Sequence, residues 1–162
     1  MTDNIILAID PGPEQSSWVV WDGRHIVDCG TWENEELLSF VENYMHTVIV
    51  EEIESYGMPV GKDVFRTVFW CGRFKQACNG AFVQMPRRTV KLNVCRDSRA
   101  KDANIRQALV DRFGDKPTKA RPNPVYRGNK PKGGEWQAWA LAVTWQDLNH
   151  IKTPEKGAQK CL

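Results

Sequence analysis

Two apolar runs that end in acidic residues constrain the fold of this chain more than any other feature. Residues 4–10 (NIILAID) are almost entirely apolar and end at Asp10, immediately before a Pro-Gly turn. Residues 47–53 contain a second apolar run, in which Glu51 and Glu52 are adjacent. Short apolar runs rich in β-branched residues predict buried strands. A carboxylate in such a strand is costly unless it is paired or binds a metal ion, so these acids are candidate functional residues.

The order of the remaining segments predicts an α/β domain. Three strands precede a helix and another strand follows it, so we expect the first three strands to be antiparallel and the fourth to join the first in parallel. The chain of 162 residues has the length of one domain, which we place at residues 1–150, with residues 151–162 as a C-terminal tail. The expected strands are 4–10, 17–21, 25–31, 47–53 and 82–85, and the expected helices are 33–44, 59–78, 101–113 and 134–148.

Composition excludes several classes of protein. The charged and hydrophobic fractions, 26% and 41%, are ordinary for globular domains. No apolar run approaches the roughly 20 residues that span a bilayer, and the first residues lack the pattern of a secretory signal, so we expect a cytoplasmic protein without a membrane partner. The five cysteines include no CxxC pair, which argues against a zinc site and favours free thiols in a reducing compartment.

Charge is unevenly distributed along the chain. The net charge is only +2, but acidic residues concentrate at 33–54 and basic residues at 84–132. Residues 115–132 alone contain six basic residues and one acidic residue. This asymmetry is typical of a chain that binds a polyanion, because lysine and arginine displace the counterions of phosphates. A solvated basic loop explains the composition equally well.

Asp10 and one of the two glutamates meet at one end of the sheet if the first and fourth strands are neighbours. Two carboxylates held close together raise each other's pKa unless a cation neutralises them, and their oxygens are the ligands that Mg²⁺ and Mn²⁺ prefer. Two such ions, about 3.5–4 Å apart, are used in phosphodiester hydrolysis. For either acid alone, hydrogen bonds from backbone donors at a strand end are an equally good explanation.

Four segments of the chain resemble, in this order, the RuvC-type Holliday junction resolvases, and the layout is most similar to the phage-encoded members. The segments are ILAIDPG, IVEEIESYGMPVGKDVFRTVFWCGRF, VKLNVCRDSRAKDANIRQAL and GGEWQAWALAVTW, and the resemblance spans nearly the whole chain. It implies an RNase H-like fold with a five-stranded mixed sheet flanked by helices. It also implies a crossover junction endodeoxyribonuclease of DNA recombination and repair, which binds two Mg²⁺ or Mn²⁺ ions and cuts four-way or other branched DNA.

The resemblance assigns roles to individual residues. Asp10 corresponds to the first metal ligand and Glu51 to the second, whereas Glu52 is expected to point to the other face of the sheet. Lys101 corresponds to a lysine at the active site, where it would stabilise the charged transition state or position the attacking water. A solvated lysine in the first turn of a helix is the alternative for Lys101.

The last helix departs from the family pattern. The family usually carries two aspartates three residues apart, and Trp136 and Trp139 occupy these places here. Glu135, one residue out of register, is the expected third metal ligand. Asp102 and Asp97 are the alternatives, and Asp102 can equally be an acidic residue that stabilises the start of a helix.

Several residues are expected to contact DNA. Tyr56 lies in the loop after the fourth strand, where it either stacks on a base at the branch point or packs against the edge of the sheet. The candidate phosphate contacts are Lys91, Arg99, Arg106, Lys119, Arg121, Arg127, Lys130 and Lys132.

The expected helix at 59–78 has more apolar residues than one core face needs, among them Phe65, Phe69 and Trp70. A four-way junction has two-fold symmetry, and its resolution needs two matched cuts. We therefore expect a homodimer built on this helix, which supplies both active sites.

Two alternative functions stay open. An RNase H-like nuclease that cuts another substrate, such as an RNA–DNA hybrid or a flap, fits the same residues. A catalytically inactive junction-binding module fits the missing aspartate pair. The sugar kinases and actin-like ATPases, which share the ancestral fold, need two such domains and a second phosphate loop, and 162 residues cannot hold them.

Overall fold

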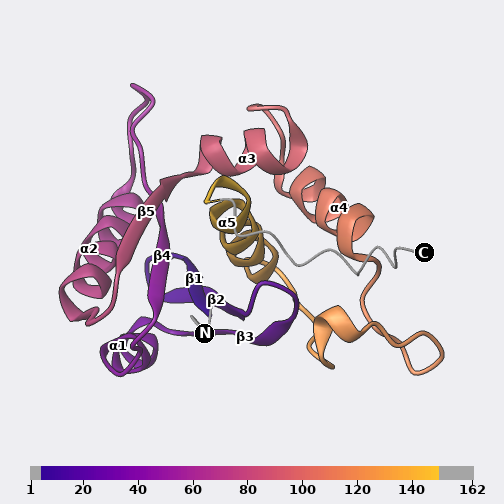
Figure 1. Cartoon of the computed structure of the whole chain (residues 1–162). Coiled ribbons are helices and arrows are strands. Elements are labelled where there is room, and N and C mark those ends of the chain that lie inside the picture. The colour runs from indigo at the N-terminus through magenta and orange to yellow at the C-terminus, as the bar shows by residue number, and fades with distance from the viewer. Residues whose placement is uncertain (1–4, 150–162) are drawn as a thin grey trace.

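One five-stranded mixed sheet forms the centre of the fold (Figure 1). The structure is a computed structural model and describes residues 5–149, so the expected tail at 151–162 lies outside the described residues. The strand order is β3-β2-β1-β4-β5; β1 to β3 are antiparallel, and β4 and β5 continue the sheet in parallel with β1. The predicted sheet is therefore confirmed. The strands are β1 (Ile6–Asp10), β2 (Gln15–Trp21), β3 (Ile26–Glu33), β4 (Thr47–Glu52) and β5 (Phe82–Pro86).

A layer of helices covers each face of the sheet (Figure 1). α1 (Asn34–Glu42) and α2 (Lys62–Ala77) cover one face, and α5 (Glu135–Leu148) packs on the other. α3 (Arg87–Cys95) and α4 (Asp102–Phe113) pack against α5. No helix within residues 5–149 is both long and apolar enough to cross a membrane.

β1 is an unbroken apolar run because both of its faces are covered. Ile6 and Ala8 belong to the core under α5, whereas Leu7 and Ile9 belong to the core under α1 and α2. A strand buried on both faces is apolar throughout rather than alternating. Because successive side chains of a strand point to opposite faces, Asp10 lies on the same side as Ile6 and Ala8, toward α5.

α5 is the buried helix of the domain and confirms the helix expected at 134–148. It packs against β1 and β2 on one side and against α3 and α4 on the other, so residues around most of its circumference are buried. Trp136 and Trp139 both lie in the core. The Thr144 hydroxyl, also buried, donates to the Ala140 carbonyl oxygen at 2.8 Å, which satisfies a polar group inside the core.

The sequence pattern does not predict α3. Val90 is the one buried residue of this short and largely polar helix, so few apolar positions indicate it in the sequence. The helix begins directly at the end of β5, where Pro86 has a φ of −61°, the angle that the proline ring favours. It ends at Cys95, and the next residue, Arg96, adopts the left-handed conformation with a φ of 56°.

α2 begins at Lys62, later than the expected start at residue 59. The positive φ of Gly57, 77°, breaks any helix in the preceding segment. Residues 53–61 instead form a loop that stands away from the body beyond β4 and α2 (Figure 1). Tyr56 in this loop is 70% exposed, so it does not pack against the edge of the sheet.

The connection between α4 and α5 is anchored in the core. It contains one turn of 3-10 helix, Pro124–Tyr126, which the Asn123 side chain caps by accepting a hydrogen bond from the Val125 backbone N–H. Tyr126 is fully buried, and its hydroxyl donates to the Gly114 carbonyl oxygen at 2.7 Å. This basic segment is therefore an ordered part of the domain.

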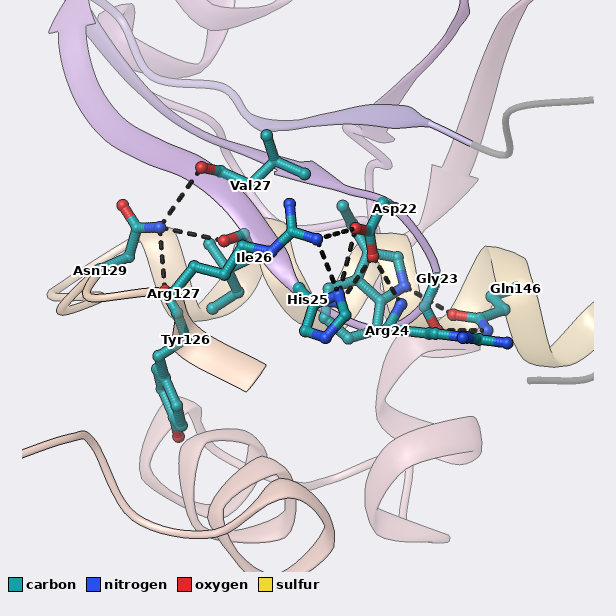
Figure 2. Close-up of polar contacts among 11 residues, drawn as sticks. Asp22, Gly23, Arg24, His25, Ile26, Val27, Tyr126, Arg127, Asn129 and Gln146 are labelled. Carbon is teal, nitrogen blue, oxygen red and sulfur yellow. Dashed lines mark hydrogen bonds and ion pairs between the residues drawn. The ribbon is translucent and has the colours of Figure 1, made fainter. Parts of the chain in front are cut away.

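A second set of contacts ties the same connection to the turn between β2 and β3 (Figure 2). The Arg127 guanidinium lies 3.2 Å from the Asp22 carboxylate and 3.2 Å from Nδ1 of His25. The Asn129 amide donates to the Ile26 carbonyl oxygen at 3.0 Å. Arg127, expected as a phosphate contact, is thus engaged by an acidic residue of the domain itself.

We predict that Tyr126→Ala lowers the free energy of unfolding by roughly 3–5 kcal/mol, as for other large buried aromatic residues. Tyr126→Phe removes only the hydrogen bond to Gly114 and should cost about 1 kcal/mol. Chemical denaturation followed by tryptophan fluorescence measures both changes. Equal, small losses in the two variants would contradict the anchoring role of Tyr126.

Candidate active site

Asp10 and Glu51 meet at the edge of the sheet where β1 and β4 end. The parallel register pairs Ile9 with Val50, so the next residue of each strand lies beside the other. The two carboxyl groups share a hydrogen bond. Both point toward α5, and Glu52 points to the opposite face because side chains alternate along a strand.

Burial and mutual repulsion favour protonation of this pair. Burial, together with the neighbouring charge of Glu51, raises the pKa of Asp10 from 3.8 to about 8. Burial also raises the pKa of Glu51, and the positive charge of Arg87 opposes that rise. Without a cation, burial and the facing charges therefore favour a proton shared between the two carboxyl groups.

Arg87, the first residue of α3, supplies positive charge to the site. Its Nη1 atom lies 3.4 Å from Oε2 of Glu51, and its Nη2 atom contacts Oδ1 of Asp102. The Glu51 side chain is 14% exposed, and the Asp102 side chain is 69% exposed. Burial disfavours the charged guanidinium, but the charges of Glu51 and Asp102 outweigh it and raise the pKa of Arg87.

Sequence reasoning missed Arg87, although the topology places it here. β5 runs parallel to β4 with Pro86 opposite Glu52, so the residue after Pro86 begins at the edge that carries Asp10 and Glu51. The carboxyl ends of parallel strands collect at one edge of a sheet, and that edge is where α/β folds place their ligands. An arginine immediately after the fifth strand was the signal.

The start of α5 closes over Asp10. A Cβ atom at Gly134 would lie 2.7 Å from Oδ2 of Asp10 and 2.6 Å from Oγ of Ser17, so the backbone approaches this closely only because the residue is glycine. The positive end of the helix also favours negative charge nearby. A cavity of about 440 Å³ adjoins Asp10, and its lining includes Asp102, Arg106 and Gly134.

Glu135 is held away from the pair. It is 3% exposed, and its carboxylate accepts hydrogen bonds from the Thr31 hydroxyl at 3.3 Å, the Cys29 thiol at 3.7 Å and the Lys132 backbone N–H at 3.0 Å. A shift of one residue turns a side chain by about 100° around a helix, which directs this carboxylate to β3. The role of Glu135 as third metal ligand stays a prediction, and it requires the carboxylate to leave these partners.

Lys101 and Asp97 lie in the segment that leads into α4. The backbone N–H of Lys101 donates to Oδ1 of Asn104 at 2.9 Å, and the Lys101 side chain is exposed. Asp97 accepts a hydrogen bond from the Arg99 backbone N–H at 2.8 Å. No contact recorded within residues 5–149 joins either side chain to Asp10 or Glu51.

Three candidate DNA contacts lie beside the pair. Tyr56 and Lys91 line a cavity of about 350 Å³ together with Arg87, Arg88 and Ser98. Arg106 reaches the cavity next to Asp10, with its guanidinium 5.3 Å from the centre of the Trp136 ring. Basic side chains therefore line two cavities, one that includes Arg87 and one that includes Asp10.

The other candidate DNA contacts lie farther along the chain. Lys119, Arg121, Lys130 and Lys132 are exposed on the connection between α4 and α5, and Arg99 is exposed before α4. Their side chains have no recorded acidic partner within the described part of the chain, in contrast to Arg127. They remain predicted phosphate contacts.

The donor set of Asp10 and Glu51 fits a divalent cation. Their carboxylate oxygens are hard ligands, and a bound cation would stabilise both of them in the charged form. Among residues 5–149, no three His, Cys, Asp or Glu side chains are arranged to hold a metal ion together. Mg²⁺ is commonly bound through one or two carboxylates and keeps several water ligands, so two carboxylates suffice for such a site.

The fold is similar to that of RuvC from Thermus thermophilus. That structure matches with a TM-score of 0.67 and 14% sequence identity over 91% of this chain and 96% of that chain. T. thermophilus RuvC in complex with a Holliday junction substrate matches with a TM-score of 0.64 and 13% identity over 91% and 95%. No family model and no curated protein matches the sequence. The likeness confirms the expected RNase H-like fold.

The pKa of Asp10 predicts a pH-dependent stability in the absence of metal. Between its ordinary pKa of 3.8 and about 8, Asp10 holds its proton more tightly in the folded chain than in the unfolded chain, so its contribution to stability falls as the pH rises through this window. A tenfold difference in proton affinity between the folded and unfolded chain changes the free energy of unfolding by about 1.4 kcal/mol. In EDTA, Asp10→Asn should lose less stability than the wild type across the window.

Thermal unfolding at a series of pH values tests this expectation, with Glu52→Gln as the matched control on the opposite face. The control should follow the wild type. An equal slope for Asp10→Asn and the wild type would show that Asp10 titrates normally in the folded chain.

Proposed function

We propose that this chain is a metal-dependent DNA endonuclease that cuts four-way junctions. The observation that carries the proposal is the Asp10–Glu51 pair at the edge where the parallel strands end. The fold supports it, because the similar structures include a RuvC bound to a Holliday junction substrate. The pair alone is compatible with other nucleic-acid substrates, so the choice of a junction rests on this likeness.

The reaction is the hydrolysis of a phosphodiester. A bond forms between the oxygen of water and phosphorus, one bridging P–O bond breaks, and the proton lost by water ends on the leaving oxygen. A divalent ion on Asp10 and Glu51 would lower the pKa of the water and stabilise the developing charge. Arg87 and Arg106, which lie beside the pair, would neutralise phosphate charge in the transition state.

The basic surface supports a substrate with several phosphates. Anchoring at Tyr126 and Arg127 holds the connection between α4 and α5 in place, so that Lys119, Arg121 and Lys130 are presented on an ordered segment. Such residues gain affinity by releasing counterions from DNA. Exposed Tyr56 stands on the loop that follows Glu51, where stacking on an unpaired base at a branch point is available to it.

The exposed face of α2 supports a homodimer. Phe65 and Phe69 are 66% and 63% exposed, and with Trp70 they line a cavity of about 580 Å³ next to the start of α1. Exposed apolar clusters of this kind mark interaction sites. A two-fold dimer through α2 would give the two active sites that paired cuts in a symmetric junction need.

Asp10→Asn and Glu51→Gln should each abolish cleavage of a four-way junction, with a loss of at least 100-fold on the order of known catalytic-group effects. Junction binding should persist or tighten, because each change removes a negative charge facing phosphate. Single-turnover cleavage in Mg²⁺ and a gel-shift assay measure the two quantities. Wild-type-like cleavage by either variant would refute the assignment of the active site.

Glu52→Gln is the matched control, since it removes a neighbouring carboxylate from the opposite face and should cleave normally. RNA–DNA hybrid and flap substrates belong in the same experiment. Faster cleavage of either one than of the junction would replace the proposed substrate. Tight junction binding without cleavage of any substrate would indicate a binding module.

Phe69→Asp should convert the dimer to a monomer, because a charge would be buried in the apolar contact. Sedimentation at micromolar concentration measures the change. Met45→Asp is the control, since Met45 is equally exposed but lies outside α2. A wild-type monomer that still cleaves both strands of a junction would refute the dimer.

A further inference from the structure

Arg87 occupies an unusual place for a cation in a site built to bind a metal. Its guanidinium contacts Glu51 on one side and Asp102 on the other, and Glu51 is hydrogen-bonded to Asp10. Its position is fixed by the backbone rather than by a long flexible loop, because Pro86 ends β5 opposite Glu52. The arginine is therefore a built-in part of the acidic cluster.

Charge balance limits how many divalent ions the cluster can take. When they are ionised, Asp10, Glu51 and Asp102 carry three negative charges, and Arg87 contributes one positive charge. The net charge of the cluster is then two negative units. One divalent ion neutralises the remainder. A second ion would leave an excess of positive charge and would have to displace the guanidinium from Glu51.

The available protein ligands also indicate that the site binds a single divalent ion. Within residues 5–149, no three acidic, histidine or cysteine side chains are arranged around one point. Asp102 is engaged by Arg87, and Glu135 is engaged by Thr31, Cys29 and Lys132. Two ions bridged by Asp10 and Glu51 alone would lack protein ligands, whereas one ion would be adequately held.

We propose that Arg87 takes the place of one of the two cations of a two-metal nuclease site, so that each chain binds a single divalent ion on Asp10 and Glu51. Asp102 positions the guanidinium and is not a metal ligand. The guanidinium would bind a non-bridging oxygen of the substrate phosphate, a contact for which its planar fork of donors is suited. The proposal rests on the proposed nuclease function and departs from the two ions expected from the sequence.

The number of Mn²⁺ ions bound per chain tests the proposal without DNA. Electron paramagnetic resonance of the free ion gives the stoichiometry for the wild type, Arg87→Gln, Asp102→Asn and the control Arg88→Gln. The wild type and Arg88→Gln should bind one ion. Arg87→Gln should bind a second ion or bind the first more tightly, because three carboxylates then lack their internal counter-charge. Asp102→Asn should still bind one ion, but more weakly, because one negative charge beside the site is lost.

Single-turnover cleavage across a Mn²⁺ titration gives an independent result. The wild-type rate should depend on Mn²⁺ with a Hill coefficient near one, and Arg87→Gln should cleave at least tenfold more slowly at saturating Mn²⁺, with partial rescue in Arg87→Lys. Two ions bound by the wild type, an unchanged ion count and affinity in Arg87→Gln, or complete loss of the bound ion in Asp102→Asn would each overturn the proposal.

The two proposals fail in different ways. Junction cleavage by a wild type that binds two ions would refute the role of Arg87 and leave the nuclease intact. One bound ion and the expected response of Arg87→Gln, with no substrate cleaved, would refute the nuclease and leave the ion count intact.

Discussion

The contact between Asp10 and Glu51 is the constraint on which the rest of the site depends. It follows from the parallel pairing of β1 with β4, whose apolar runs end side by side at the same edge of the sheet. Two acids held together with little water are unfavourable unless charge is supplied. The fold supplies it from two other elements that reach the same edge, since Arg87 follows β5 and the positive end of α5 begins at Gly134.

α5 shows how the requirements of packing and of the site are divided. Trp136 and Trp139 lie in the core, and both contact the ring of Tyr126, with centroids 6.4 Å and 5.4 Å away. The indole N–H groups of both tryptophans are buried without a partner within the described residues, a cost that the large apolar contact outweighs. Because these side chains of α5 are packed in the core, the helix directs no carboxylate at Asp10. Only a glycine fits at position 134, where the backbone at the start of the helix approaches Asp10.

The sequence was sufficient to predict the elements whose signal is burial. The apolar runs located the strands, and their order predicted the topology. Asp10, Glu51 and Glu52 stood out as acids in apolar strands, and the family resemblance selected Glu51 over Glu52. It was insufficient where position depends on tertiary contacts. α3 is short and largely polar, so the sequence did not indicate that helix or the position of Arg87. The sequence also did not indicate that Thr31 of β3 would donate a hydrogen bond to Glu135.

The two helical layers divide the proposed functions between them. Asp10 and Glu51 point to the layer that contains α5, and Arg87 and Arg106 stand on α3 and α4 of the same layer. The exposed aromatic residues of α2 belong to the opposite layer. DNA bound at the acidic pair would therefore leave α2 free for a second copy of the chain. Residues 53–61 connect β4, which carries Glu51, directly to α2. Contact between the α2 helices of two copies would therefore fix the distance and the orientation between their two β4 strands, and so between the two acidic pairs that face one junction.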